Sequence, residues 1–135
     1  MPFSENLKPE DRKILVEYRI EKANQSIEQV KGVVSLQYWN IAANRLYYSA
    51  YYACSALLIS RGIEASTHKG VIRMISYKFI KDGLLPTRDA ELLGRLFSMR
   101  QTGDYEDLMD WEKEDILPLI PEVEDFIKRI KSLLT

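Results

Sequence analysis

The sequence predicts an all-α protein: an up-and-down bundle of four main helices plus a short extra helix. Between the few Gly and Pro residues, apolar side chains recur at steps of three and four, the period of an amphipathic helix. No segment reads clearly as a strand. The 135 residues, 46% of them hydrophobic, suffice for one core, so we expect a single domain over residues 1–135. Short loops between long helices favour antiparallel packing.

The first predicted helix covers residues 9–31. Pro9 is tolerated in a first turn, and the acidic Glu10 and Asp11 complement the helix dipole there. We expect Gly32 to end this helix. Its apolar stripe consists of Ile20, Ala23, Ile27 and Val30.

The second predicted helix covers residues 38–60 and should be the most buried, because its apolar residues occupy every side of the helical wheel. Five of the eight tyrosines lie between Tyr38 and Tyr52. Gly62 follows with the chemistry of a left-handed cap. These features predict a central, aromatic-rich helix.

Three further helices follow along the chain. Thr67 can cap a shorter helix over residues 68–81, and Thr87 can cap a fourth helix over residues 87–103. After two prolines that suit a helix start or a kink, apolar residues recur at helical spacing to the C-terminus. A fifth helix is therefore expected there.

Composition excludes several protein classes. With 19 Lys and Arg against 20 Asp and Glu, the formal net charge of −1 excludes a generally polycationic nucleic-acid coat protein. The single Cys54 excludes an intramolecular disulfide framework and fits a reducing cytoplasm. The chain start lacks the pattern of a secretory signal, and the uncharged stretch 46–60 is shorter than the ~20 residues that a membrane span needs. We expect a cytoplasmic protein without membrane contact.

The near-zero total charge hides a local asymmetry. Residues 61–100 carry a balance of +4, whereas residues 101–115 carry −6. Two readings stay open: the two surfaces pair with each other or with solvent, or the basic segment contacts phosphate.

Arg100 continues the apolar stripe of the fourth helix, so its guanidinium needs a partner. The nearest candidates are Asp104 and the hydroxyl of Tyr105. Arg45, the only charged residue of the second helix, lies on the same side as Tyr48. This pattern fits a structural salt bridge, and it also fits a site where arginine donors bind phosphate oxygens while Tyr or Asp orients a hydroxyl.

His68 is the only histidine and lies beside Lys69 at the start of the third helix. Capping or packing is the usual role of a histidine there. Without a second His or clustered Cys, it cannot anchor an ordinary transition-metal site, so we expect neither a metal nor another cofactor.

Three segments in order resemble the HEPN domain family: the tyrosine-rich RLYYSAYYACSALL at 45–58, THKGVI at 67–72, and LFSMRQTGDY at 96–105. The chain looks most like the small stand-alone bacterial and archaeal branch, over about residues 10–134. This resemblance implies a bundle of four long helices with a short extra one, usually a homodimer whose Arg-bearing helices face a shared cleft. Many members are metal-independent RNA-cleaving toxins paired with a nucleotidyltransferase antitoxin, and others only bind RNA or nucleotide.

The chain departs from the family's nuclease pattern, in which a His follows the Arg after four to six residues. Here these positions hold Tyr105, Glu106 and Asp107. The resemblance therefore implies that Arg100 contacts phosphate, that Asp104 is its polar companion, and that Tyr105 stands at the position of the His. Tyrosine, with an ordinary pKa near ~10, is a poor general base at neutral pH.

Three functions remain open at this point. The first is a dimeric module that binds RNA or nucleotide phosphates, with a nucleotidyltransferase partner; the second is a metal-independent ribonuclease using Arg100 with Tyr105 or His68; the third is a structural helical dimer. The catalytic candidates are Arg100 and Tyr105. The candidate phosphate-binding or nucleotide-binding residues are Arg100, Asp104, Tyr105, Arg45, His68 and Lys69. The aromatic residues expected at the surface for dimerisation are Tyr38, Trp39 and Trp111.

Overall fold

The computed structural model describes the backbone of residues 7–105 and 110–134, and the side chains of all of these except residues 102–105. Every regular element in these ranges is helical, which confirms the predicted all-α class. The elements are α1 (Pro9–Ser35), α2 (Trp39–Ser60), α3 (His68–Ile75) with a following π-helical turn η2 (Ser76–Ile80), α4 (Thr87–Tyr105), α5 (Lys113–Ile116) and α6 (Leu119–Leu134).

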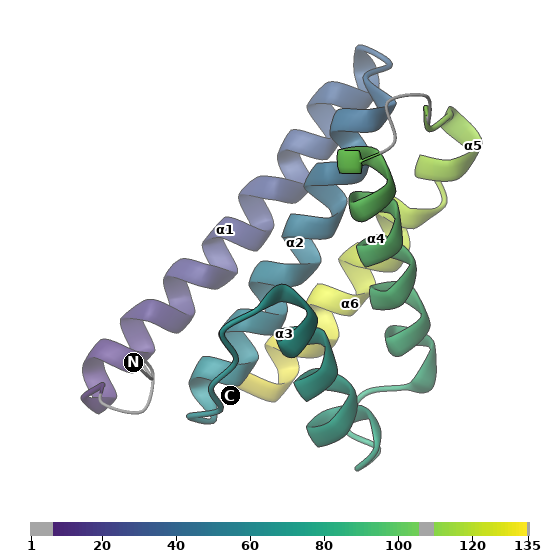
Figure 1. The fold of residues 1–135 in the computed structure, drawn as a ribbon. Helices are drawn as coiled ribbons and strands as arrows, with labels where there is room; N and C mark the ends of the chain where they lie inside the picture. The colour runs from purple at the N-terminus through teal and green to yellow at the C-terminus, as the bar shows by residue number, and fades with distance from the viewer. Residues whose placement is uncertain (1–6, 106–109, 135) are drawn as a thin grey trace.

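The four long helices form the bundle, with α2 at its centre. α1 and α2 run side by side along their length, and α4 and α6 lie on the other side of α2 (Figure 1). The shorter α3 and η2 pack beside α2 and α4. α2 therefore contacts every other long helix, and it holds half of its residues buried in the core. The prediction that this helix is the most buried is confirmed.

Gly32 does not end the first helix, contrary to the prediction. α1 continues to Ser35, and the chain reverses where Gln37 takes a φ of 63° and the Tyr38 N–H bonds to the Val33 carbonyl at 2.9 Å. A mid-helix Gly costs only about 1 kcal/mol relative to Ala, which the packing of α1 on α2 outweighs. The end of α1 is thus set by the tight connection to α2.

The later helix boundaries also differ in detail from the prediction. The third segment leaves α-helical geometry at Ser76 and finishes as a π turn, while the fourth helix extends to Tyr105. The short α5 was not predicted. It begins at a capping box in which Glu112 and Asp115 each accept a hydrogen bond from the other's backbone N–H.

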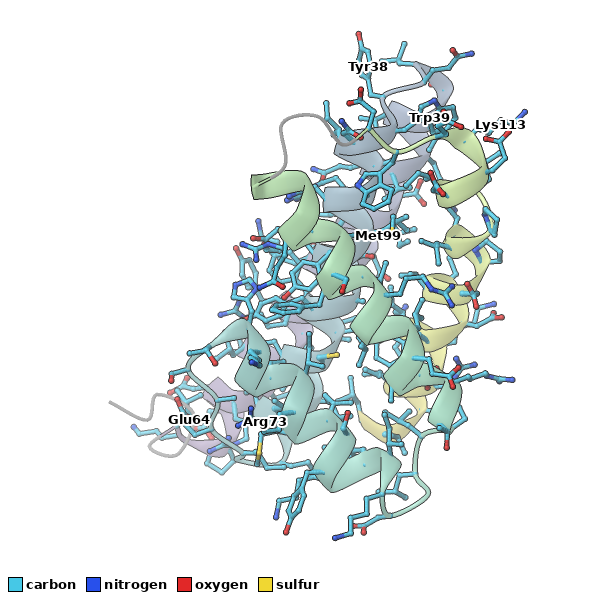
Figure 2. The ribbon with its side chains drawn as sticks, turned by 45° about the vertical axis from the view of Figure 1, so that its right-hand side comes forward. Tyr38, Trp39, Glu64, Arg73, Met99 and Lys113 are labelled. Atoms are coloured by element: carbon cyan, nitrogen blue, oxygen red, sulfur yellow. The ribbon has the colours of Figure 1, made fainter. Side chains whose placement is uncertain are left out.

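Of the three aromatic residues expected at the surface, only Tyr38 is largely exposed, at 53%. The prediction is wrong for Trp39 and Trp111, which are half-buried and pack against the core. The reason is a local tether: the Asn40 side chain donates to Asp110 and accepts from the Trp111 N–H, which draws this segment onto the start of α2. Figure 2 shows Tyr38 at the tip of the bundle.

None of the helices that the structure describes combines the length and apolar character needed to cross a membrane.

Candidate functional site

Three tyrosines and the only histidine meet between α2 and α3. Tyr47, Tyr48 and Tyr51 lie at steps of three and four, so they share one side of α2. The His68 ring stacks on Tyr51, with centroids 4.2 Å apart and planes 8° apart, and its Nδ1 lies 2.7 Å from the Tyr47 hydroxyl. We call these four residues the tyrosine–histidine cluster.

The local sequence around His68 fixes where its ring lies. Thr67 caps α3, since its side-chain oxygen accepts the Gly70 N–H at 2.9 Å. Gly70 allows this close approach: a Cβ added there would lie 2.9 Å from the Thr67 Oγ1. His68 is the first residue of α3. The capped first turn therefore directs the imidazole onto α2.

Two arginines lie over the same rings. The Arg100 guanidinium from α4 lies 5.4 Å from the Tyr47 centroid and 5.6 Å from that of Tyr48, within cation–π range. Arg45 lies 4.9 Å from the Tyr48 centroid, which confirms that it shares a side of α2 with this tyrosine. Its guanidinium also donates to the Asn44 side chain at 2.9 and 3.1 Å. Tyr48 thus lies near two cationic groups.

Burial and charge keep the cluster neutral. Burial, and then the positive charge of Arg100, hold the pKa of His68 below its ordinary value of 6.5, so the imidazole is mainly neutral at pH 7. Burial raises the pKa of Tyr47 although Arg100 opposes that effect, and burial also raises the pKa of Tyr51. Whichever partner donates in the Tyr47–His68 hydrogen bond, the other imidazole nitrogen, Nε2, takes no part in it.

The structure brings together three of the predicted site residues, Arg45, His68 and Arg100, around the tyrosine–histidine cluster. Lys69 is exposed beside them. The side chains of Asp104 and Tyr105 lie outside the described residues. Nowhere in the described part of the chain do three or more His, Cys, Asp or Glu side chains form a group that could hold a metal ion.

The sequence did not predict that Tyr47 and Tyr51 contact His68, or that Tyr47 also lies beneath Arg100. Their spacing was visible, but aromatic residues in an apolar helix usually signal core packing. Sequence reasoning also missed Arg19 of α1, whose positive charge acts on Tyr51 and which lines the same small pocket as this tyrosine. No local pattern marks that arginine, because only the packing of α1 on α2 brings it near.

Comparison with known proteins identifies the family. The sequence model of the HEPN domain matches residues 16–133, nearly the whole chain. The chain belongs to the HEPN domain family. A "UPF0332 protein" of Thermotoga maritima is 30% identical to it over 92% of this chain and 94% of its own length. "Putative toxin MJ0142" of Methanocaldococcus jannaschii is 31% identical over 88% of this chain and 81% of its own length. A second protein of that organism, "Putative toxin MJ0605", is 27% identical over 85% of both chains.

The HEPN match includes the whole tyrosine–histidine cluster, together with Arg45 and Arg100. The site therefore lies within the matched region. It joins side chains from α2, α3 and α4.

Proposed function

We propose that this HEPN domain binds the phosphate groups of RNA or nucleotides at the tyrosine–histidine cluster. The observation that carries the proposal is the placement of two guanidiniums, Arg45 and Arg100, over Tyr48, with the neutral His68 beside them. Arginine offers planar donors for phosphate oxygens, and tyrosine rings offer faces on which bases stack. Lys69, exposed next to His68, adds positive charge at the edge of the site.

The proposal includes partners. A homodimer with the two sites facing a shared cleft, acting with a nucleotidyltransferase-type protein, fits the family resemblance and the toxin names of the Methanocaldococcus jannaschii relatives. We expect sedimentation to show a dimer at micromolar concentration. A nucleotidyltransferase gene beside the gene for this chain would support the two-component arrangement.

Fluorescence anisotropy with a short labelled single-stranded RNA tests the binding site. We expect Arg100→Gln to weaken binding by about tenfold, the loss of one charge-assisted contact. The slope of log affinity against log salt should also fall by about 0.7 for each lost phosphate contact on a single strand. This slope separates a phosphate contact from damage to the fold.

Arg88→Gln is the matched control, because Arg88 is exposed and lies 12 residues before Arg100 on the same helix, about 18 Å away along its axis. It should leave both affinity and slope near wild-type values. The proposal fails if wild-type protein does not bind RNA or nucleotides, or if the two variants behave alike.

A second candidate function is metal-independent RNA cleavage, and the contact of His68 with Tyr47 favours it. The His that the nuclease pattern places after Arg100 is absent, but α3 supplies a neutral imidazole to the same rings. In the tautomer whose Nδ1–H donates to the Tyr47 hydroxyl, His68 Nε2 can accept the proton of a ribose 2′-hydroxyl as its oxygen attacks the adjacent phosphorus. Arg100 can stabilise the charge that develops on the phosphate while the 5′-oxygen leaves and takes a proton from the solvent. The products are a 2′,3′-cyclic phosphate and a 5′-hydroxyl end.

RNA incubated with a chelator and with wild type, His68→Gln or Arg88→Gln tests this function. We expect 5′-hydroxyl ends with wild type and Arg88→Gln, and a large loss with His68→Gln, in the range of 10²–10⁴-fold typical of a general base. Intact RNA with the wild-type protein, or equal cleavage by His68→Gln, would rule out this role for His68.

A further inference from the structure

A small pocket lies beside Tyr51 and is lined by Arg19 of α1. It has a volume of about 150 Å³ and lies between α1, the C-terminal half of α2 and the segment that leads to α3. Its polar lining comes from Arg19, Tyr51 and Ser55, and Glu64 belongs to its rim. Glu64 is exposed at the edge of the molecule (Figure 2). Apolar side chains, among them Leu58 and Val71, complete the wall.

Arg19 is the unusual group in this pocket. Its Nε is buried and has no hydrogen-bond partner among the described residues, and no ion pair neutralises its guanidinium there. A buried donor without a partner carries a desolvation penalty in the free protein. The charge of Arg19 also acts on the Tyr51 phenol, which places the two groups near each other. The pocket therefore places a guanidinium whose Nε has no partner among the described residues next to two hydroxyls.

We propose that this pocket is a second anion subsite that takes the terminal phosphate of an RNA strand or nucleotide bound at the tyrosine–histidine cluster. Arg19 would supply the charged donors, and Tyr51 and Ser55 would supply hydroxyl donors. Pockets for drug-sized ligands have volumes of about 300–1,000 Å³, so about 150 Å³ suits one phosphate group and not a whole nucleotide.

Continuity with the neighbouring site supports a strand end as the occupant. The Tyr51 ring that lines the pocket also stacks on His68 at 4.2 Å, so one side chain belongs to both places. An RNA strand whose terminal phosphate lies in the pocket does not continue beyond it, whereas an internal phosphodiester needs room for a sugar on each side.

Two matched RNAs, identical except for a terminal phosphate or hydroxyl, test the subsite; the phosphate is placed in turn at the 5′ and the 3′ end. This binding experiment rests on the proposed RNA binding at the tyrosine–histidine cluster. We expect wild type to bind one of the phosphorylated forms about tenfold more tightly. Arg19→Gln should abolish this preference and keep the affinity for the hydroxyl form, whereas Arg100→Gln should weaken both forms. Equal preference in wild type and Arg19→Gln would overturn the proposal.

Thermal melts with inorganic phosphate test the same pocket without RNA. We expect phosphate to raise the melting temperature of wild type and Arg88→Gln by the same amount, and to raise those of Arg19→Gln and Arg100→Gln by less, because each of these two variants has lost one of the two proposed phosphate sites. Arg19→Lys, which keeps the charge but not the planar donors, should retain part of the effect. In the absence of phosphate, Arg19→Gln should melt no lower than wild type, because it removes a cation that has no partner. Equal stabilisation of wild type and Arg19→Gln would overturn the subsite, even if the cluster binds no RNA.

Discussion

Asp89 of α4 and Arg129 of α6 form an ion pair inside the bundle. The Arg129 Nε and one terminal nitrogen donate to the two carboxylate oxygens at 3.0 and 2.5 Å. The Asp89 side chain is only 1% exposed, whereas that of Arg129 is 26% exposed. The pair therefore joins two helices that otherwise make few contacts with each other, and its two members differ in access to water.

This difference predicts that losing the cation is worse than losing the anion. Arg129→Met leaves a fully buried carboxylate without a partner, a loss of about 3–5 kcal/mol in the free energy of unfolding. For a domain of this size, that corresponds to a melting temperature lower by roughly 10–20 °C. Asp89→Asn leaves a guanidinium that still reaches water, so we expect a smaller loss of about 1–3 kcal/mol. The double variant Asp89→Leu/Arg129→Met should be more stable than Arg129→Met, since no buried charge remains.

Urea denaturation of wild type, the three variants and Lys128→Met measures these differences. Lys128 is the exposed neighbour of Arg129 on α6 and is the matched control, which should stay near wild type. The reasoning is refuted if Arg129→Met loses no more than the control, or if Asp89→Asn is the less stable of the two single variants.

Four further outcomes concern His68, Thr67 and Cys54. His68, as the only histidine, gives one set of imidazole signals in NMR; its pKa should rise in Arg100→Gln, and an unchanged pKa would contradict the effect of Arg100's charge. Since the folded pKa is lowered, wild-type stability should fall as the pH drops from about 6.5 through the folded pKa, and His68→Gln should flatten this dependence in thermal melts. Thr67→Ala should lower stability by about 1 kcal/mol in urea, against little change for Thr67→Ser. Cys54 is fully buried and burial raises its pKa, so iodoacetamide should label it only after denaturation; rapid labelling of the native protein would contradict this burial.

Helical periodicity sufficed for the fold class and for the central place of α2, because a helix that is apolar all round can only be buried. It failed at the end of α1, where Gly32 is a local signal and the turn at Gln37 depends on packing against α2. It also failed for Trp39, since its burial depends on the tether between Asn40 and Asp110, 70 residues apart.

Some features of the candidate site could likewise be predicted from the sequence, and others could not. That Arg45 and Tyr48 lie on the same face of α2 was predictable, because two residues separated by three positions on one helix always lie on nearly the same side. The contact between His68 and Tyr47 was not, since it depends on how α3 lies on α2. The pairing of Asp89 with Arg129, 40 residues later in the chain, could not be predicted from the sequence either, because it depends on how α6 lies on α4. Which residues of one helix share a face can be predicted from the sequence, whereas contacts between residues of different helices depend on how the helices pack.

The arrangement of charges suggests how a ligand would act on the whole bundle. Arg45 is the only charged residue of α2, and the other cationic or titratable groups at its rings come from Arg19 of α1, His68 of α3 and Arg100 of α4. A ligand that contacts the cluster and the Arg19 pocket therefore contacts groups from four helices at once. Binding to the folded state alone stabilises it by an amount that grows with the logarithm of the ligand concentration divided by the dissociation constant, about 2.7 kcal/mol when this ratio is one hundred. Such a ligand holds α1, α3 and α4 against α2, so its effect on stability should be largest when both subsites are filled.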